Sequence, residues 1–458
     1  MFRFIHTSFL LFACHLPHPM WAQEKKDSPS TPRPIARLLW QDDTELTLKW
    51  SDVTRRSDGL TLSAQKVTHF PKLDGERQSF VQMEPTAGIL IVGIHDKEDG
   101  NFQSGWVAVN SGVVEEEHGD HSHWHFEKPP GVVLSQLDQQ QGNPAHVYNY
   151  EGDIFLANDK NNGFTLLRAA ALNSATNSTS PTDVSRFYSG GGGHITLAAV
   201  NGKVCYSTWV DRDGENQGRV DVIPIDGDSI RKGYSLKLPS GGLHGATANS
   251  GRVFFAPSDG IYWLDADLGL KTRPEEVQIR HLSLGADSKS GKPLRTGAFT
   301  NHKQHVLFMT GTADQASLCI VDAKATEPSV LKISMPIAEG LAWTTPACVK
   351  TSAGKKYALL FSDRRSGDAE ESLAVVDLDP NADGNLADAQ VAKMIPVGAS
   401  RVVGHGGHHE VSFSASGRLA FITNPGDGSI WILSLKDLSV ESKHQVGGIP
   451  SRIVAVGG

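Results

Sequence analysis

The chain has 458 residues and a formal net charge of −8 at pH 7, with 43 Lys and Arg against 51 Asp and Glu. This length is sufficient for a large hydrophobic core, and no long block of basic residues argues for a nucleic-acid partner or an anionic membrane surface. After Ala22, no stretch approaches the roughly eighteen apolar residues of a membrane span, so we expect no membrane insertion.

Residues 1–22 have the features of a secretory signal peptide. A basic residue precedes an apolar run from Phe4 to Cys14, and small Ala22 stands just before a charged segment. We expect cleavage after Ala22 and export to the periplasm. Lipidation at Cys14 is the less favoured alternative, because the apolar run before it is short and contains a bulky aromatic at the critical position. Residues 23–34 are rich in Ser, Pro, Thr and Lys and are predicted to form a disordered linker.

From residue 35 onward the sequence repeats one pattern with a period near fifty residues. Each copy has a short apolar run, a turn with glycine, a run rich in Val, Ile and Phe, a polar loop and a second apolar run that often ends in Asp. The copies begin near Val81, His146, His194, His244, Thr296, Thr344 and His408. Short β-rich units at this period are typical of a β-propeller, in which one unit forms one blade.

We therefore predict an all-β chain that forms a single β-propeller domain over residues 35–458, with seven blades as the favoured count. The segment Ala36–Leu48 is apolar enough to add a strand that closes the ring against the C-terminal blade. Alternatively, residues 37–70 form an eighth, degenerate blade. Either arrangement leaves the seven repeats in place around one central channel.

Three cysteines follow the predicted signal, and each lies in an apolar run typical of a strand: Cys205, Cys319 and Cys348. Buried thiols are the expected state, and no pair has the spacing of a thiolate metal site. One disulfide among the three is the open alternative in an oxidising compartment, and it would leave one thiol free.

The segment 115–128 concentrates possible metal ligands. Four imidazoles and one carboxylate lie within eight residues, namely His118, Asp120, His121, His123 and His125. Imidazole is the commonest protein ligand for zinc and copper, and alternation along an extended segment would place the last three rings on one side. Three glutamates at the start of the segment would attract a cation. The alternative is a solvated linker whose histidines bind nothing.

Four further histidines occupy near-equivalent positions in the repeats. His146 lies six residues before its turn glycine, His194 eight, His244 seven and His409 eight. If each repeat opens on the innermost strand of its blade, these side chains converge at one mouth of the channel. A single such histidine usually has a hydrogen-bonding role within a turn, but four in register favour a metal site with three or four ligands.

The neighbours of these histidines support the same interpretation. His405 and His408 lie beside His409 and are candidate ligands too. Glycines at 190–193 and at 404, 406 and 407 permit unusual backbone angles, which would let imidazoles approach an ion from tight turns. Because the segment 115–128 lies between the first and second repeats, we expect it to emerge at the same mouth.

Two motifs, Glu117-His118-Gly119-Asp120-His121 and Gly242-Leu243-His244-Gly245, carry a resemblance to a known family. The chain is similar to the AztD family of periplasmic zinc metallochaperones, β-propellers that deliver zinc to the solute-binding protein of a zinc ABC importer. The resemblance spans roughly residue 36 to the C-terminus. It implies that His118, Asp120 and His121 form a mobile capture segment and that His194 and His244 are ligands at the channel mouth.

We therefore expect a non-enzymatic carrier that captures zinc and transfers it to a zinc solute-binding protein. We also expect a monomer without a nucleic-acid or membrane partner. Copper is the alternative metal, and a copper-containing redox propeller similar to nitrous oxide reductase is the alternative activity. A propeller of the YVTN type that serves only for protein interaction, with incidental histidines, is the second alternative.

Overall fold

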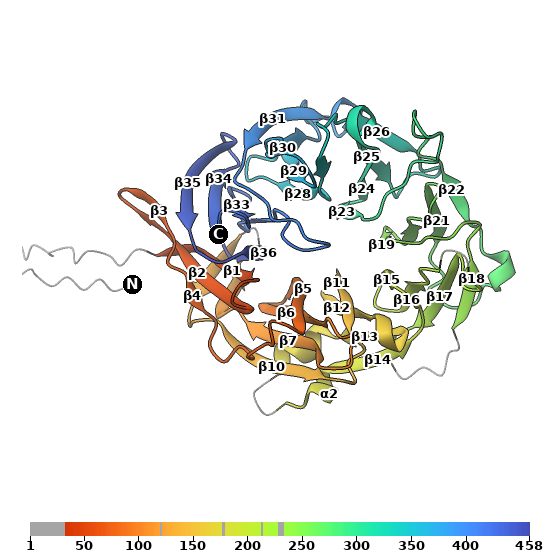
Figure 1. The fold of residues 1–458 in the computed structure, drawn as a ribbon, viewed down its shortest axis with the longest axis horizontal. Helices are drawn as coiled ribbons and strands as arrows, with labels where there is room; N and C mark the ends of the chain where they lie inside the picture. The colour runs from red at the N-terminus through yellow and green to blue at the C-terminus, as the bar shows by residue number, and fades with distance from the viewer. Residues whose placement is uncertain (1–32, 120, 176–178, 212–213, 228–232) are drawn as a thin grey trace, which may run out of the picture.

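The computed structural model describes residues 33–458 apart from residue 120 and the ranges 176–178, 212–213 and 228–232. The predicted signal peptide and nearly all of the predicted linker lie outside the described residues, as does Asp120. Within the described part, eight small antiparallel sheets are arranged in a ring (Figure 1), and we call the axial region that their innermost strands surround the channel. The predicted β-propeller is confirmed.

Seven blades correspond to the seven repeats, and the strands of each blade follow one another from the channel outward. The first blade holds β5 (Gln78–Thr86), β6 (Ile89–Asp96), β7 (Ser104–Asn110) and β10 (Gly131–Asp138). The second holds β11 (Pro144–Tyr150), β12 (Asp153–Asn158), β13 (Gly163–Leu167) and β14 (Ser185–Ser189). The third holds β15 (Leu197–Val200), β16 (Val204–Thr208), β17 (Arg219–Pro224) and β18 (Tyr234–Lys237). The fourth holds β19 (Ala246–Asn249), β20 (Arg252–Phe255), β21 (Ile261–Asp265) and β22 (Arg280–Leu282).

The remaining three repeats follow the same order. The fifth blade holds β23 (Thr300–His302), β24 (His305–Thr310), β25 (Ser317–Asp322) and β26 (Val330–Ser334). In the sixth, β27 (Leu341–Trp343) and β28 (Ala347–Lys350) both pair with β29 (Lys356–Arg364), followed by β30 (Ser372–Asp377) and β31 (Gln390–Pro396). The seventh holds β32 (Val411–Phe413), β33 (Leu419–Asn424), β34 (Ser429–Ser434) and β35 (Ser439–Gln445).

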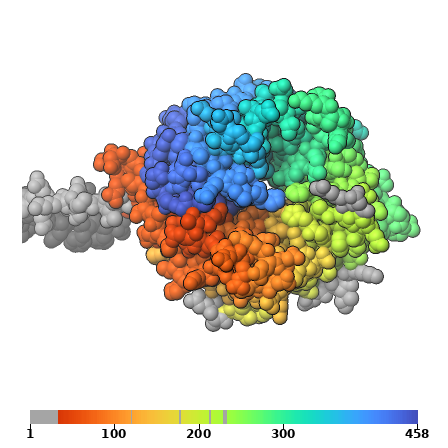
Figure 2. Space-filling view, in the orientation of Figure 1, coloured from red at the N-terminus to blue at the C-terminus, as the bar shows by residue number. Residues whose placement is uncertain are grey.

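The eighth blade joins the two ends of the propeller. It consists of β36 (Pro450–Val456), β1 (Pro34–Asp42), β2 (Thr47–Arg56) and β3 (Gly59–Thr61), with β4 (Gln65–Lys66) paired to β2. β36 pairs with β1 from Arg37 opposite Val456 to Asp42 opposite Pro450. The ring therefore has eight blades, the second of the two counts that the sequence allowed. Figure 2 shows the N-terminal blades in red and orange directly against the blue C-terminal blade.

The burial of the strands explains their composition. The second and third strands of a blade are covered on both faces by the neighbouring blades, so β33 and β34 are buried at every residue and consist largely of aliphatic and aromatic residues. The outermost strand faces water on one side, and β35 accordingly alternates between exposed and partly covered residues. β-Branched and aromatic side chains suit this stack of sheets, and the core consists of apolar clusters shared between adjacent blades.

Helices contribute little to the described structure. α1 (Ala169–Ser174) and α2 (Pro181–Val184) lie in the connection between β13 and β14. Short 3-10 turns occur at η1 (Asp159–Asn161), η2 (Pro274–Glu276), η3 (Ala313–Gln315) and η4 (Leu386–Asp388). Among the described residues, the two α-helices have six and four residues, and none reaches the length and hydropathy of a membrane span.

The three described cysteines form no disulfide. Cys205 and Cys319 are buried and Cys348 is partly buried. Burial raises the pKa of Cys319 and of Cys348 to about 12, so both thiols are protonated at neutral pH. Protonated, enclosed thiols are poor metal ligands and poor nucleophiles.

Strand direction determines which end of the channel each loop reaches. We call the end where β11 begins, near His146, the mouth face, and the other end, at the Gly152 turn between β11 and β12, the opposite face. The Thr86 hydroxyl donates a hydrogen bond to the Gly152 carbonyl at 2.5 Å, so the end of β5 lies at the opposite face. Ile89, directly across from Thr86, also pairs with Asn110 at the end of β7.

The histidine-rich segment therefore emerges at the opposite face. It forms a hairpin of β8 (Val113–Glu117) and β9 (Ser122–Phe126), which follows β7 and precedes β10 of the same blade. The expectation that it shares a mouth with His146 is wrong. The repeat pattern in the sequence did not include β10. Because β10 carries the chain from the opposite face back to the mouth face, a hairpin that precedes β10 lies at the opposite face.

Candidate metal centre

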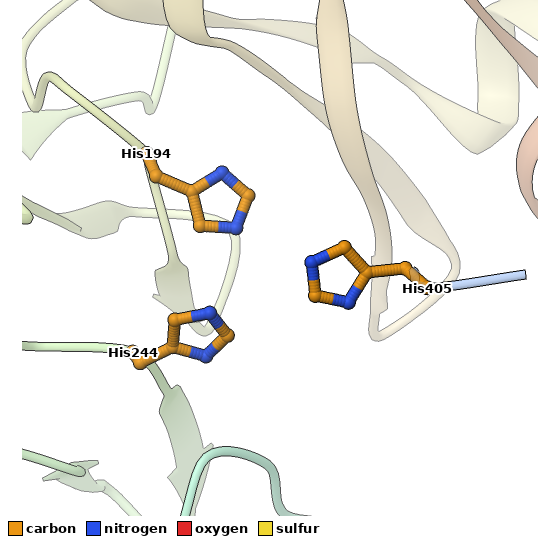
Figure 3. A group of neighbouring side chains, drawn as sticks. All are labelled: His194, His244 and His405. Atoms are coloured by element: carbon orange, nitrogen blue, oxygen red, sulfur yellow. The ribbon is translucent and has the colours of Figure 1, made fainter. Parts of the chain in front are cut away.

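Three imidazoles from different blades meet at the mouth face. Ring nitrogens of His194, His244 and His405 all lie within 4.8 Å of one another. His194 and His244 precede the innermost strands of the third and fourth blades, and His405 reaches them from the seventh blade across the channel (Figure 3). Tetrahedral zinc with bonds near 2.05 Å needs ligand nitrogens about 3.3 Å apart. Modest side-chain rotations would bring these three nitrogens onto one ion.

The glycine run before His194 sets the approach of its ring. Gly193 has a φ of +79°, and a Cβ built there would lie 2.7 Å from the Val210 carbonyl oxygen. A Cβ at Gly192 would lie 2.3 Å from the Trp209 ring. Only glycine fits where the chain passes this close to residues 209 and 210, which follow β16. The glycine run in the sequence predicted such a close approach. The two glycines therefore allow the backbone before His194 to pack closely against the chain at the edge of the channel.

A carboxylate orients His194 from the second blade. Nδ1 of His194 lies 2.9 Å from Oδ2 of Asp159, whose other oxygen accepts the backbone N–H of Ile195 at 2.9 Å. A carboxylate partner places the imidazole proton on Nδ1 and leaves the Nε2 lone pair for an ion. His146 lies on the far side of this ring, with its Nε2 2.9 Å from Nε2 of His194. His146 is thus an immediate neighbour of the three-histidine cluster.

The surroundings favour neutral imidazoles. Burial, together with nearby His194 and His244, lowers the pKa of His146 from its ordinary 6.5 to about 3. Burial is also the main cause of the lowered pKa of His244 and of His405, and His194 contributes to both. At neutral pH these rings carry no charge, and neutral imidazole is the form that binds a metal.

His408 and His409 share one buried carboxylate. Nδ1 of His408 and Nδ1 of His409 each lie 2.7 Å from a different oxygen of Asp363. Although burial opposes it, these two imidazoles hold the pKa of Asp363 below its usual range. Nε2 of His409 also lies 3.0 Å from the Gly398 carbonyl, so both nitrogens of this ring are hydrogen-bonded within the fold. His409 therefore anchors the segment through both of its ring nitrogens, whereas His408 takes part in these contacts through Nδ1 only.

A second group of possible ligands is formed by Asp363, Glu371 and His409, all buried. Glu371 accepts hydrogen bonds from the backbone N–H of Arg364 at 2.7 Å and of Ser400 at 2.8 Å. Because these carboxylate and imidazole groups already have protein partners, the group is best described as a hydrogen-bond network. It fixes the segment that leads to His405.

The interior of the channel carries a charge pair next to the mouth cluster. The Arg452 guanidinium forms an ion pair with Glu410, and Arg452 is among the groups that lower the pKa of His146. Burial raises the pKa of Glu84, on β5, to about 7, with Arg452 opposing the shift and Glu410 adding to it.

The hairpin at the opposite face gathers its own imidazoles. The ring centroids of His118, His121 and His123 lie 5.0 to 5.6 Å apart. Nε2 of His125 lies 2.8 Å from Oε2 of Glu116, and Nε2 of His118 lies 3.4 Å from the other oxygen of the same carboxylate. The three rings that lie together are thus His118, His121 and His123, whereas the alternation in the sequence predicted His121, His123 and His125 on one side. Asp120, the predicted fifth ligand, lies outside the described residues.

The other side of the hairpin holds it on the propeller. A Cβ built at Gly457 would contact the rings of Trp124 and Phe126, which alternate with the histidines along β9. The guanidinium of Arg37, on β1, lies 5.7 Å from the centre of the Phe126 ring. The hairpin is thus fastened by its aromatic side to the closing blade and presents its imidazoles to water.

Asp159 and Asp363 were not among the residues predicted from sequence. Asp159 directly follows β12 and Asp363 is the penultimate residue of β29, so both lie at the end of the second strand of a blade, and both contact histidines that precede the innermost strand of the next blade. A repeated position was therefore the available signal. Aligning the ends of the second apolar runs, rather than only their starts, would have paired each carboxylate with its histidine.

Solved structures share this architecture along nearly the whole chain. The structure of apo AztD from Citrobacter koseri has a TM-score of 0.62 at 15% identity, covering 93% of this chain and 99% of that chain. A second crystal structure of Citrobacter koseri AztD has a TM-score of 0.61 at 16% identity, with the same coverage of 93% and 99%. Dihydro-heme d1 dehydrogenase NirN in complex with DHE has a TM-score of 0.52 at 10% identity, covering 96% and 79%.

At these identities the likeness shows the β-propeller fold. AztD and NirN share it with this chain to different degrees, and the fold alone does not choose between their activities. No protein-family model and no curated protein sequence matches the chain.

Proposed function

We propose that this protein is a periplasmic zinc carrier of the AztD family, which binds the ion at its channel mouth and transfers it to the solute-binding protein of a zinc ABC importer. The observation that carries the proposal is the convergence of His194, His244 and His405 from three blades, with ring nitrogens within 4.8 Å. The two sequence motifs and the full-length likeness to AztD structures support the choice of family and cargo.

The chemistry of the mouth cluster suits transfer rather than permanent storage. Three imidazoles would leave one coordination position of a tetrahedral zinc ion open to a ligand from another protein. A receiving protein can therefore bind the ion before the last imidazole leaves. Binding and release in this way break no covalent bond of a substrate, so the proposal includes no catalytic step.

The hairpin supplies a separate capture site in this proposal. His118, His121 and His123 would share an ion with Asp120, and the glutamates of β8 would attract it electrostatically. Because the hairpin lies at the opposite face, its ion and the ion at the mouth are exposed to different partners. We assign to the hairpin a second ion that it takes up from solution independently, and we assign transfer to the mouth.

A transfer assay tests this function. The mature protein, beginning after residue 22, is loaded with zinc, mixed with a zinc-free periplasmic zinc solute-binding protein, separated and analysed for metal. The proposal predicts transfer by the native protein and by the control H281A, which removes an exposed histidine of the outer strand β22. It predicts little transfer by the double variant H194A/H244A.

The same assay distinguishes the alternatives. Preferential binding of copper with visible absorbance would favour the redox propeller over the zinc carrier. Absence of tight binding of either metal would favour a propeller that serves only for protein interaction. Zinc that binds tightly but stays on the protein when the solute-binding protein is added would exclude the carrier function while retaining the metal site.

A further inference from the structure

The three imidazoles at the mouth are held in different ways. His194 and His244 are half-buried and lie on short turns that lead directly into β15 and β19. His405 is exposed and lies near the tip of the segment 398–409, which we call the His405 arm. Figure 3 shows His405 facing the other two rings from the opposite side of the channel.

The base of the His405 arm is firmly anchored. The backbone N–H of Gly398 donates to Asn424 at 2.8 Å and that of Ala399 donates to Asp427 at 3.0 Å. At the same end Ser400 donates to Glu371, and at the other end Asp363 binds His408 and His409. The two ends of the arm are therefore fixed to the sixth and seventh blades.

The tip of the arm is held mainly by bonds within itself. Arg401 donates to the Gly407 carbonyl at 2.8 Å, and Val403 and Gly406 exchange backbone hydrogen bonds at 3.1 and 3.0 Å. Val403 is 77% exposed, and the residues from 403 to 406 are all exposed to solvent. A segment with exposed backbone bonds and little buried apolar contact opens at low cost compared with the blades.

We propose that His405 is the exchangeable ligand of the channel-mouth site, and that the tip of the His405 arm withdraws from His194 and His244 when the ion is handed over. The proposal rests on the zinc-carrier function. It divides the site into two imidazoles fixed by the blades, which determine where the ion sits, and one imidazole on the arm, which controls how fast the ion leaves.

Two substitutions separate the ligand from the motion of the arm. His405→Ala removes the imidazole and should lower zinc affinity and raise the release rate about tenfold or more. Gly406→Ala keeps the imidazole and restricts the arm, because a Cβ at this position meets only the Val403 carbonyl oxygen at an ordinary 3.7 Å and its φ is not positive. Restricting a compatible glycine should slow release about two- to fivefold.

The matched control is Gly75→Ala. Gly75 is also an exposed loop glycine without a positive φ, and a Cβ there would meet Leu46 at 3.5 Å. Gly75 is distant in the sequence from the histidines of the mouth and lies outside the His405 arm. Any general effect of replacing a loop glycine by alanine appears in this variant, which should release zinc at the native rate.

The experiment is stopped-flow release of zinc from the loaded mature protein to a chromophoric chelator, combined with equilibrium titration of each variant. Faster release from H405A together with slower release from G406A supports the proposal. Native release rates in both variants, with zinc still bound at the mouth, overturn it and leave the carrier function intact. Failure of the native protein to bind zinc at the mouth overturns both this proposal and the function on which it rests.

Discussion

The Nε2 atoms of His146 and His194 lie 2.9 Å apart, and Nδ1 of His194 faces the carboxylate of Asp159 at the same distance of 2.9 Å. The carboxylate accepts a hydrogen bond from Nδ1–H of His194, so His146 must donate through Nε2 to the His194 lone pair. A zinc ion at His194 would take the place of this donor. The mouth therefore holds one imidazole whose ligating nitrogen is oriented in advance.

We predict that Asp159→Asn weakens zinc binding at the mouth about 10- to 100-fold, because an amide no longer fixes the tautomer of His194. Competitive titration against a zinc chelator measures the change. Asp267→Asn is the control, since Asp267 accepts hydrogen bonds in a surface loop from Thr272 and Lys271. Equal affinity of the two variants would show that Asp159 does not orient the ligand.

The lowered pKa values of the mouth histidines predict zinc retention in mild acid. A proton competes with zinc only near the folded pKa, which lies at about 3 for His146 and below the ordinary 6.5 for His244 and His405. Zinc at the mouth should therefore remain bound below pH 6.5. Metal content after dialysis across a pH series of a variant with the four hairpin histidines replaced by Ala measures the retention at the mouth, and loss of this zinc already above pH 6.5 would contradict the prediction.

The same pKa values predict the opposite trend for the stability of the metal-free fold. The unfolded chain takes up a proton on His146 near pH 6.5, whereas the folded chain does so near pH 3. Stability therefore falls as the pH decreases between these values, because the unfolded state binds more protons. His146→Gln should flatten this part of the profile in thermal unfolding. If His146→Gln unfolded with the same pH dependence as the native protein, this result would contradict the burial of a neutral His146 ring.

The location of the two histidine groups at opposite faces predicts independent sites. Replacing His118, His121, His123 and His125 together by Ala should remove the hairpin ion and leave the affinity at the mouth within about threefold, since distant sites are usually additive. Isothermal titration of the native and quadruple variants measures stoichiometry and affinity together. A large loss of mouth affinity would indicate coupling through the ring that the geometry does not provide.

Gly193→Ala should both destabilise the fold and misplace His194. The new Cβ would lie 2.7 Å from the Val210 carbonyl oxygen at a φ of +79°, and we expect a loss of about 1 to 3 kcal/mol in denaturant unfolding. Gly251→Ala is the matched control, because its φ is +77° and a Cβ there has nothing within 4 Å. It should cost about 1 kcal/mol through backbone strain alone and leave zinc affinity unchanged.

Much of the fold was predictable because each blade carries the same burial pattern. The doubly covered second and third strands, such as β33 and β34, have uninterrupted apolar runs that are visible at a period near fifty residues. The outer strand β10 has no fully buried run and escaped notice. The eighth blade was harder to recognise because its innermost strand, β36, comes from the other end of the chain.

The candidate site was predictable to the extent that it follows the repeat. His194 and His244 occupy equivalent positions before innermost strands, and the structure brings them together. His405 joins them through the length and path of the arm, which no repeat position specifies. Which of His405, His408 and His409 faces the cluster depended on Asp363, which binds His408 and His409 from 45 and 46 residues away in the chain.

Competitive zinc titration of the mature protein, beside H194A/H244A and the hairpin quadruple variant, shows which histidines hold the ion. We predict tight binding at the mouth that survives in the quadruple variant and is lost in H194A/H244A. Tight zinc binding that persists in H194A/H244A and disappears in the quadruple variant would contradict this prediction, because the ion would then be held by the hairpin and not by the imidazoles of the channel mouth.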